Sequence, residues 1–300
     1  MKLSVIVPTL NGRDQLAGCL DALAERVPDA EVVVVNGPSA DGTTGMVRDR
    51  DDVDVLVEIA DRGINVARNA GIDRATGDVV ALLNHGLVVE DGWFDALSSG
   101  LDGGDVVTGP THRELETGLT TETVESRTIK GRTVTYFNGD NAAFSRDALD
   151  ALDGFDEYLL TGGSRDAAHR LAGMDYEVVW ESEMCVRNEF GTDGGVAETD
   201  WNWKYRALAY RLAKNYGLRP TVVARVLGHG LRDAASTLRE VATGNAAPSS
   251  WFGNGRDVLT GIGSGLKDGV AARFSDRSTR RNPRGRSLRS DRAVTVYDWR

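Results

Sequence analysis

The chain contains few cysteines and few lysines, and it has no long apolar run. Its 300 residues include two cysteines, Cys19 and Cys185, which excludes a disulfide framework and forms no metal-binding pattern along the sequence. No stretch approaches the roughly 20 apolar residues that a membrane-spanning helix needs. A secretory signal is not expected at Met1, because the first apolar run ends at Pro8 as a strand would. We therefore expect a cytoplasmic protein, soluble or peripheral on a membrane.

Charge is distributed unevenly along the chain. Residues 201–300 hold 19 Lys or Arg and 7 Asp or Glu, whereas residues 1–200 hold 16 and 38. Five of the 35 basic residues are lysines. An acidic, lysine-poor body is typical of a protein that stays soluble at high salt, where repulsion is screened. The basic C-terminal segment predicts an anionic partner. An anionic membrane surface is favoured over nucleic acid, because no aromatic residues are interleaved with the arginines and no nucleic-acid-binding module is present.

Short apolar segments alternate with amphipathic segments in the first third of the chain. Leu16, Leu20, Leu23 and Val27 recur at helical spacing between two of the apolar runs. The predicted strands cover residues 2–7, 31–36, 52–58 and 78–83. This alternation predicts an α/β fold in which helices flank a mostly parallel sheet that is buried on both faces. Ligands bind outside the carboxyl ends of such strands, so we expect the chemistry in the loops that follow them.

Motifs in those loops resemble the N-terminal half of family-2 glycosyltransferases, which adopt the Rossmann-like, nucleotide-sugar-binding GT-A fold. They are Val5-Ile6-Val7-Pro8-Thr9 with Asn11, Ser39-Ala40-Asp41-Gly42-Thr43, and Ala67-Arg68-Asn69-Ala70-Gly71-Ile72. Asn141-Ala142-Ala143-Phe144-Ser145-Arg146 and Gly154-Phe155-Asp156-Glu157 resemble the acceptor-side motifs of the family. The resemblance covers residues 1–188 and implies inverting transfer of a sugar from a nucleotide sugar, with a UDP-sugar as the first expectation.

The resemblance also implies donor-binding residues. These are Pro8, Thr9, Asn36, Asp41, Arg68, Asn69, Asn84 and His85. Asn36 stands where the family usually has an aspartate that touches the base, and an amide can still hydrogen-bond a base.

A metal site is less clearly implied. The family holds a divalent metal with an Asp-x-Asp motif, and this chain has Asn84-His85-Gly86 at that position. Mg²⁺ prefers carboxylate and water oxygens, which makes an amide and an imidazole poor ligands for it. Three interpretations of His85 stay open: a ligand for a softer ion such as Mn²⁺, a direct contact to a phosphate oxygen, or an ordinary polar loop residue.

The expected catalytic base also departs from the family pattern. An inverting enzyme needs a carboxylate that takes the proton from the acceptor hydroxyl. The family's Glu-Asp pair falls on Gly163-Ser164, so Asp166 is the first candidate and Asp140 the second. An alternative role for Asp166 is a carboxylate that faces the dipole at a helix N-terminus. Residues that could bind the acceptor or a phosphate are Asn141, Arg165, His169 and Arg170.

The sequence predicts three parts: a GT-A domain over residues 1–200, an amphipathic helical segment over 201–245, and a partly flexible Gly/Arg-rich basic tail over 246–300. Residues 111–135 are expected to form a polar loop or an excursion from the sheet, and residues 133–137 are expected to re-enter the sheet. The acidic, lysine-poor chain also resembles the haloarchaeal enzymes that build dolichol-phosphate-linked glycans for protein N-glycosylation.

That resemblance implies a lipid-linked saccharide acceptor and a hexose or uronic acid donor. Arg165 and Arg170 could match the carboxylate of a uronic acid bidentately, which favours that donor slightly. The alternative is a protein that has lost catalysis and binds a nucleotide sugar, a glycan or a partner enzyme.

Overall fold

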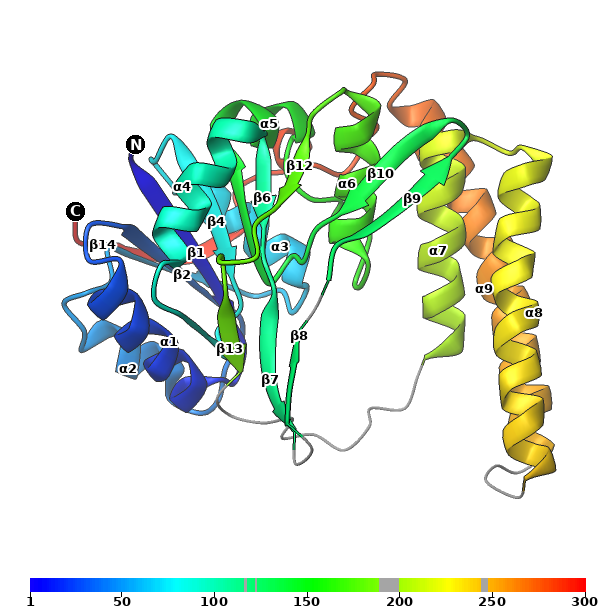
Figure 1. The fold of residues 1–300 in the computed structure, drawn as a ribbon, viewed down its shortest axis with the longest axis horizontal. Coiled ribbons are helices and arrows are strands. Elements are labelled where there is room, and N and C mark those ends of the chain that lie inside the picture. Colours follow the sequence, from blue (N-terminus) through cyan, green and yellow to red (C-terminus); the bar gives the residue numbers. More distant parts are fainter. Residues whose placement is uncertain (116–117, 122, 189–199, 244–247) are drawn as a thin grey trace. The chain divides into compact units, whose positions relative to one another are not determined.

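The computed structural model describes residues 1–115, 118–121, 123–188, 200–243 and 248–300 (Figure 1). The chain forms two compact units. The first contains Met1–Asp193 and Arg284–Arg300, and the second contains Gly194–Pro283. Within the described residues, every helix is too short or too polar to cross a membrane.

An eight-stranded sheet forms the centre of the first unit, with the order β12-β6-β11-β4-β1-β2-β3-β14 (Figure 1). The four strands β4, β1, β2 and β3 are parallel, whereas β11 and β14 run antiparallel to their neighbours. This arrangement confirms the predicted mostly parallel α/β fold. The bounds are β1 Leu3–Thr9, β2 Glu31–Asn36, β3 Val55–Ile59, β4 Val79–Leu83, β6 Val106–Thr108, β11 Asn141–Ser145, β12 Val178–Trp180 and β14 Ala293–Asp298.

Helices cover both faces of this sheet, as near-continuous apolar strands require. The core on one face includes side chains of α1 (Arg13–Arg26), α2 (Thr43–Arg48) and α4 (Trp93–Gly103). The core on the other face includes α3 (Ile64–Ile72), α5 (Arg146–Leu152) and α6 (Gly163–Gly173). Successive residues of β1 alternate between the two cores. Gly71 of α3 lies so close to the sheet that a Cβ there would overlap the Ile6 side chain, so the glycine permits this close packing.

Residues 111–135 differ from the predicted polar loop. Two described strands there, β7 (Thr111–Leu115) and β8 (Gly118–Thr121), join β5 (Leu87–Val89) and β13 (Val186–Asn188) in a four-stranded sheet. The other two, β9 (Glu125–Ile129) and β10 (Arg132–Tyr136), form a hairpin of their own instead of entering the main sheet. Lys130 and Gly131 have φ of 56° and 75°, which suits a tight hairpin turn. Threonine-rich polar strands lack the apolar alternation that sequence patterns detect, which explains the difference.

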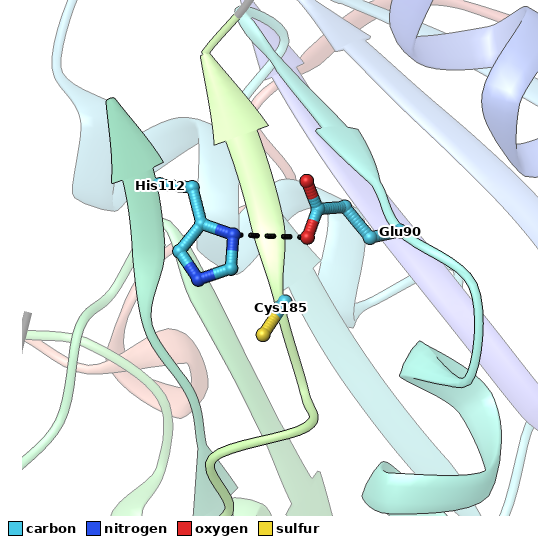
Figure 2. Close-up of side chains that lie close together, drawn as sticks. All are labelled: Glu90, His112 and Cys185. Atoms are coloured by element: carbon cyan, nitrogen blue, oxygen red, sulfur yellow. Dashed lines mark hydrogen bonds and ion pairs between the residues drawn. The ribbon is translucent and has the colours of Figure 1, made fainter. Parts of the chain in front are cut away.

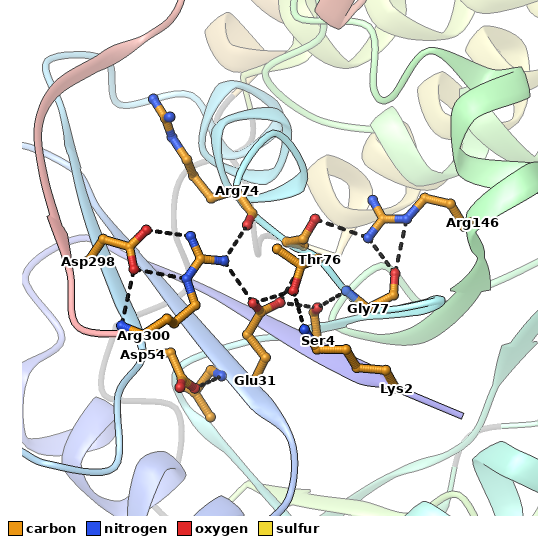
Figure 3. Close-up of polar contacts among 12 residues, drawn as sticks. Lys2, Ser4, Glu31, Asp54, Arg74, Thr76, Gly77, Arg146, Asp298 and Arg300 are labelled. Carbon is orange, nitrogen blue, oxygen red and sulfur yellow. Dashed lines mark hydrogen bonds and ion pairs between the residues drawn. The ribbon is translucent and has the colours of Figure 1, made fainter.

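The C-terminal residues return to the first unit and join its sheet. Strand β14 pairs antiparallel with β3, after a short 3-10 helix η1 (Arg286–Leu288). Figure 3 shows the Arg300 side chain between Asp298 and Glu31, with its Nη1 atom 2.8 Å from Glu31 Oε1. Burial acts to raise the pKa of Glu31, but hydrogen bonds from Ser4, Thr76 and Arg300 outweigh it and lower the pKa to about 2. Residues 246–300, expected as a basic tail, therefore include a strand of the main sheet.

A second connection of the C-terminal residues centres on Glu157. Its side chain is fully buried, and its carboxylate forms ion pairs with Arg289 at 2.8 Å and with Arg292 at 2.6 Å. Glu157 also accepts a hydrogen bond of 2.9 Å from Asn69 of α3. Two cations and an amide compensate the cost of burying this carboxylate.

The second unit contains the helices α7 (Trp201–Tyr216), α8 (Pro220–Ala242) and α9 (Pro248–Ser275). The predicted helices beginning at Trp201 and Pro220 are present, and the glycine-punctuated stretch after them is helical as well. Three of its glycines are spaced four residues apart and face the backbone of α7. A Cβ on any of them would overlap a carbonyl oxygen of α7: Gly261 with Asn202, Gly265 with Arg206, and Gly269 with Tyr210. Close contact between two helix backbones thus explains glycines that suggest a loop in the sequence.

Candidate active site

A cavity of about 100 Å³ opens at the carboxyl ends of β1, β2 and β3. We call it the strand-end cavity. Its walls come from the residues that follow these strands, from the start of α3 and from the turn after β4. The lining residues are Pro8, Thr9, Leu10, Gly37, Ile59, Asp61, Arg62, Gly63, Ile64, Ala67, Asn84 and His85. This is the edge of the sheet at which the sequence predicts the ligand site.

Thr9 places a buried hydroxyl in the wall of the strand-end cavity. The residue is 5% exposed, and its Oγ1 finds no hydrogen-bond partner in the part of the protein that the structure describes. A buried polar group without a partner costs about 1–3 kcal/mol of stability. A polar ligand in the cavity would remove that cost, so Thr9 is a strong candidate for a ligand contact.

His85 lies in the turn after β4 with its ring against Gly12. The ring Nδ1 is 3.2 Å from the Pro8 carbonyl oxygen, so this nitrogen carries a proton and donates. A Cβ at position 12 would overlap the ring, which explains the glycine there. Burial lowers the pKa of His85, although the Pro8 carbonyl and the charges of Asp140 and Asp41 act to raise it. A neutral imidazole with a protonated Nδ1 keeps Nε2 as an acceptor.

A larger cavity of about 690 Å³ adjoins the first, and Ile64 lines both. We call it the helix-side cavity. It is lined by α3, by the hairpin β9–β10, by the loop before β11 and by residues 160–165 at the start of α6. Arg165 forms part of its wall, where its guanidinium lies 4.6 Å from the Tyr136 ring centroid and pairs with Glu125 at 2.6 Å.

Asp140 and Arg68 form an ion pair that lines the helix-side cavity. The Arg68 side chain is 7% exposed, and its Nη2 donates to Asp140 Oδ1 at 3.1 Å and to the Gly139 carbonyl at 2.7 Å. The Asp140 side chain is 47% exposed. The backbone carbonyl of Asp140 accepts a hydrogen bond of 3.0 Å from the backbone amide of Asn84. A fixed buried cation therefore holds an accessible carboxylate next to the turn after β4.

Asp166, the first candidate base, lies inside the protein. Its side chain and that of Arg170 are both fully buried and form an ion pair at 2.9 Å. The Arg170 guanidinium also donates to the carbonyls of Leu152 and Gly154 at 2.7 and 3.0 Å. These bonds join α6 to the end of α5, which gives both residues a structural role. In this structure neither side chain is available to a sugar hydroxyl or a phosphate.

Four other predicted contacts also face inward. Asn36 donates to Thr44 at the start of α2 and accepts from Ser39 in the loop after β2. The Asn69 side-chain amide donates to the Phe155 carbonyl at 2.9 Å and accepts from the Phe155 backbone amide at 2.8 Å. The Asn141 amide donates to the Met184 carbonyl and accepts from the Trp93 indole. His169 is 2% exposed and lies edge-on to Tyr136. Their polar groups position the loops around the two cavities.

Asp41 joins the loops after β1 and β2. Its carboxylate accepts hydrogen bonds from the Arg13 amide at 3.0 Å and from the Thr43 hydroxyl at 2.5 Å. Burial acts to raise the pKa of Asp41, but the bonds from Thr43 and Arg13 outweigh it and hold the pKa below its usual value. Asp41 is exposed and stands beside the strand-end cavity rather than in its wall.

Two charged residues of the strand-end cavity were not predicted from the sequence. Asp61 and Arg62 follow β3, and both are exposed. The Asp61 carboxylate accepts a 2.6 Å hydrogen bond from the Gly63 amide, which shapes the entry into α3. Their position after a parallel strand was the available signal, because every such strand end contributes to the same edge of the sheet.

The turn after β4 does not fit a Mg²⁺ or Mn²⁺ ion held by the protein. The Asn84 side-chain oxygen accepts from the Gly86 amide at 2.9 Å, and His85 Nδ1 faces the Pro8 carbonyl. The carboxylates near this turn already have partners: Asp140 is paired with Arg68, Asp41 accepts from Arg13 and Thr43, and Asp61 accepts from Gly63. Such ions prefer several oxygen ligands, which these residues do not supply together.

Comparison with known proteins gives a consistent result. Residues 4–153 match the glycosyl transferase family 2. The chain is similar to glycosyltransferase AglE of Haloferax volcanii, with 26% identity over 204 residues. That alignment covers 61% of this chain and 65% of AglE, so the chain spans less than two thirds of that relative's length.

Solved structures share the fold of this chain. Residues 1–349 of TarS from S. aureus, in complex with UDP-GlcNAc, superpose with a TM-score of 0.63 at 18% identity, covering 95% of this chain and 90% of that one. The mannosyltransferase PcManGT from Pyrobaculum calidifontis, in complex with GDP-Man and Mn²⁺, gives 0.56 at 20% identity, with coverage of 92% and 88%. These likenesses confirm the predicted GT-A fold.

Proposed function

Because the chain belongs to the glycosyl transferase family 2, we propose that it transfers a sugar from a nucleoside diphosphate sugar to an acceptor hydroxyl. The observation that carries this proposal is the pair of adjoining cavities at the carboxyl edge of the sheet, with the Arg68–Asp140 pair in the wall of the larger one. The donor nucleotide would occupy the strand-end cavity, and the acceptor would enter the helix-side cavity.

Side chains in the walls of the two cavities have parts in the proposed reaction. The acceptor oxygen forms a bond to the anomeric carbon as the bond from that carbon to the diphosphate breaks, with inversion. Asp140 takes the proton of the acceptor hydroxyl, as a general base does. Arg62 and Arg68 stabilise the negative charge that develops on the leaving diphosphate. Thr9 Oγ1 and His85 Nε2 offer hydrogen-bond partners to the donor.

A panel experiment tests the proposal. The full chain is incubated with UDP- and GDP-sugars and a membrane extract that contains polyprenyl-phosphate-linked glycans, with EDTA or with Mn²⁺. Turnover with at least one donor supports the proposal. Because PcManGT was solved with Mn²⁺, the EDTA arm measures whether this chain shares that requirement or works without a metal, as the turn after β4 suggests.

A second candidate is a protein that binds a nucleotide sugar without transferring it. The start of α6 favours it, since Gly163 and Ser164 line the helix-side cavity without a carboxylate and Asp166 is buried. The two candidates differ in turnover and not in donor affinity. Donor binding without product across the whole panel would therefore establish the second candidate and contradict the first.

Replacing Thr9 with valine separates ligand contact from packing. Valine has nearly the same shape and lacks the hydroxyl whose oxygen is buried without a partner. We expect the Thr9→Val variant to unfold at an unchanged or higher urea concentration, because an unsatisfied buried polar group is removed. Its donor affinity should fall about 5-fold to 10-fold, the value of one hydrogen bond of about 1–1.4 kcal/mol. Calorimetric titration with the active donor measures this, and unchanged affinity would remove Thr9 from the donor site.

We place the acceptor on a lipid, at the surface of an anionic membrane, because of the exposed face of α8. Leu227, Leu231 and Leu238 are 43%, 73% and 52% exposed, and their spacing of four and seven residues puts them on one side of the helix. Val222 and Val226 are buried on the opposite side. Three exposed arginines accompany the leucines along the helix: Arg225, Arg232 and Arg239. An apolar stripe beside arginines suits a helix that lies in an anionic interface.

The described site does not favour one donor sugar over another. Arg170 is buried and bonded within the protein, and Arg165 is paired with Glu125. The sequence-based preference for a uronic acid therefore loses its support. A hexose donor and a uronic acid donor are equally compatible with the site.

Vesicle binding tests the role of α8. The full chain should sediment with vesicles that contain anionic lipid, and high salt should weaken this binding. A triple variant, Leu227→Ser, Leu231→Ser and Leu238→Ser, should bind at least about 10-fold more weakly, because each leucine contributes about 1.5–3 kcal/mol when it leaves water. Leu288→Ser, at a leucine of the first unit that is 63% exposed, is the matched control. Equal binding by the triple variant and the control would contradict the proposal.

A further inference from the structure

Side chains from three strands of the four-stranded sheet meet outside the two cavities. Glu90 directly follows β5, Cys185 directly precedes β13, and His112 lies in β7. Each of them offers a metal ligand, and the three ligand atoms all lie within 4.8 Å of one another. Figure 2 shows the His112 ring facing the Glu90 carboxylate, with the Cys185 sulfur beside them. The cysteines form no metal-binding pattern along the sequence, because Glu90, His112 and Cys185 are far apart in the chain.

Strand register brings the three residues together. Val186 of β13 pairs with Val89 of β5 and with Thr111 of β7. The antiparallel pairing places Cys185 level with Glu90, whereas the parallel pairing places His112 level with Arg187, two residues along β13 from Cys185 and on the same face of the sheet. The Glu90 amide also donates to the Cys185 carbonyl at 3.0 Å, which extends the pairing beyond β5. The cluster is therefore set by backbone hydrogen bonds rather than by chance side-chain conformations.

We propose that Glu90, His112 and Cys185 form a binding site for a Zn²⁺-type cation. Thiolate, imidazole and carboxylate are the ligands that Zn²⁺ takes in proteins, whereas Mg²⁺ and Ca²⁺ take oxygen ligands. A tetrahedral ion with bonds of about 2.0–2.3 Å separates its ligand atoms by about 3.2–3.6 Å. The distance from His112 Nδ1 to Glu90 Oε2 is already 2.9 Å, so small side-chain rotations suffice. The fourth position would hold water or a further ligand.

The free state of the site is consistent with this assignment. The His112 and Glu90 side chains are 18% and 28% exposed, which leaves a path for an ion. The Cys185 thiol is half-buried. That thiol donates to the Ser182 carbonyl at 2.9 Å and would release its proton to solvent when the ion binds. A cationic side chain also lies near the three residues: Arg187 Nε is 4.0 Å from Glu90 Oε1.

The site would tie the small sheet to the active-site turn. Strand β5 begins immediately after Asn84-His85-Gly86, so an ion held by Glu90 would fix the strand on which that turn rests. The site is separate from the turn itself and does not require that the protein transfers sugar.

Cobalt is a direct probe of the proposed site. The full chain, freed of metal with a chelator, is titrated with Co²⁺ and observed by absorption spectroscopy. We expect one Co²⁺ per chain, with a near-ultraviolet thiolate-to-cobalt band that Zn²⁺ removes. Cys185→Ser should abolish the band, and Cys19→Ser, at a buried cysteine elsewhere in the core, should retain it. His112→Gln should lower the affinity at least about 10-fold.

A second measurement guards against misfolded variants. Zn²⁺ should raise the Tm of the wild-type chain and of Cys19→Ser, because an ion that binds only the folded state stabilises it. It should leave the Tm of Cys185→Ser unchanged. Absence of the thiolate band from the wild-type chain, or its persistence in Cys185→Ser, would overturn the proposal.

Discussion

Replacing Asp140 with asparagine is expected to lower kcat about 1,000-fold while the donor Kd changes less than about 3-fold. A general base contributes about 100-fold to 10,000-fold, and asparagine cannot accept the proton of the acceptor hydroxyl. The amide oxygen can still accept from Arg68, so the ion pair becomes a hydrogen bond and the loop before β11 keeps its position. Single-turnover assays with the donor identified by the panel would separate the chemical step from binding.

Asp166→Asn is the matched control for this experiment. Asp166 and Arg170 are fully buried partners, so the change should lower the free energy of unfolding and leave the kcat of the folded fraction near the wild-type value. The opposite pattern, with an active Asp140→Asn variant and an inactive but stable Asp166→Asn variant, would return the role of base to Asp166.

Replacing Arg292 should lower the free energy of unfolding more than replacing Arg289, the other C-terminal partner of Glu157. The Arg292 side chain is 7% exposed and its partner Glu157 is fully buried. Breaking a buried pair from one side costs about 3–5 kcal/mol, because a charge stays in the interior without its partner. Since Arg289 still faces Glu157 in the variant, we expect Arg292→Met to lower the free energy of unfolding by about 3 kcal/mol, measured by urea denaturation.

Arg289→Met provides the comparison within the same cluster. Arg289 also pairs with Glu157, but its side chain is 49% exposed. Exposed partners contribute about 0–1 kcal/mol, so this variant should remain close to the wild type. Equal losses in the two variants would show that burial does not set the strength of these contacts.

The sequence predicted the parallel core well because its signals are local. Four runs of β-branched residues and the helical spacing of Leu16, Leu20 and Leu23 indicated β1 to β4 and α1 correctly. The polar strands β7, β8 and β9 were missed because they lack apolar alternation, and α9 was missed because the cause of its glycines lies elsewhere in the chain. The glycines of α9 are needed by the backbone of α7, and no local pattern shows that.

The candidate site was predicted less completely than the fold. Motif positions identified the correct loops, but they did not tell which polar side chains face a ligand. Asn69 is bonded to Phe155, far away in the sequence, and Arg170, the partner of Asp166, is bonded to the distant carbonyls of Leu152 and Gly154, and a side chain's direction depends on such partners. Asp61 and Arg62 belong to no sequence motif, and their position after a parallel strand is what indicates the site. The Glu90, His112 and Cys185 site depends wholly on strand register and has no sequence spacing of its own.

The pairing of β14 with β3 has a consequence for synthesis on the ribosome. Strand β3 ends at residue 59, and β14 begins at residue 293. A nascent chain therefore makes β1 to β4 and all three helices of the second unit while the outer edge of β3 still has free amide and carbonyl groups. Such an edge can pair with another chain. Unit 1 should thus be most prone to aggregation during translation and refolding, and a peptide with the sequence of residues 284–300, added to refolding protein, should compete with that aggregation.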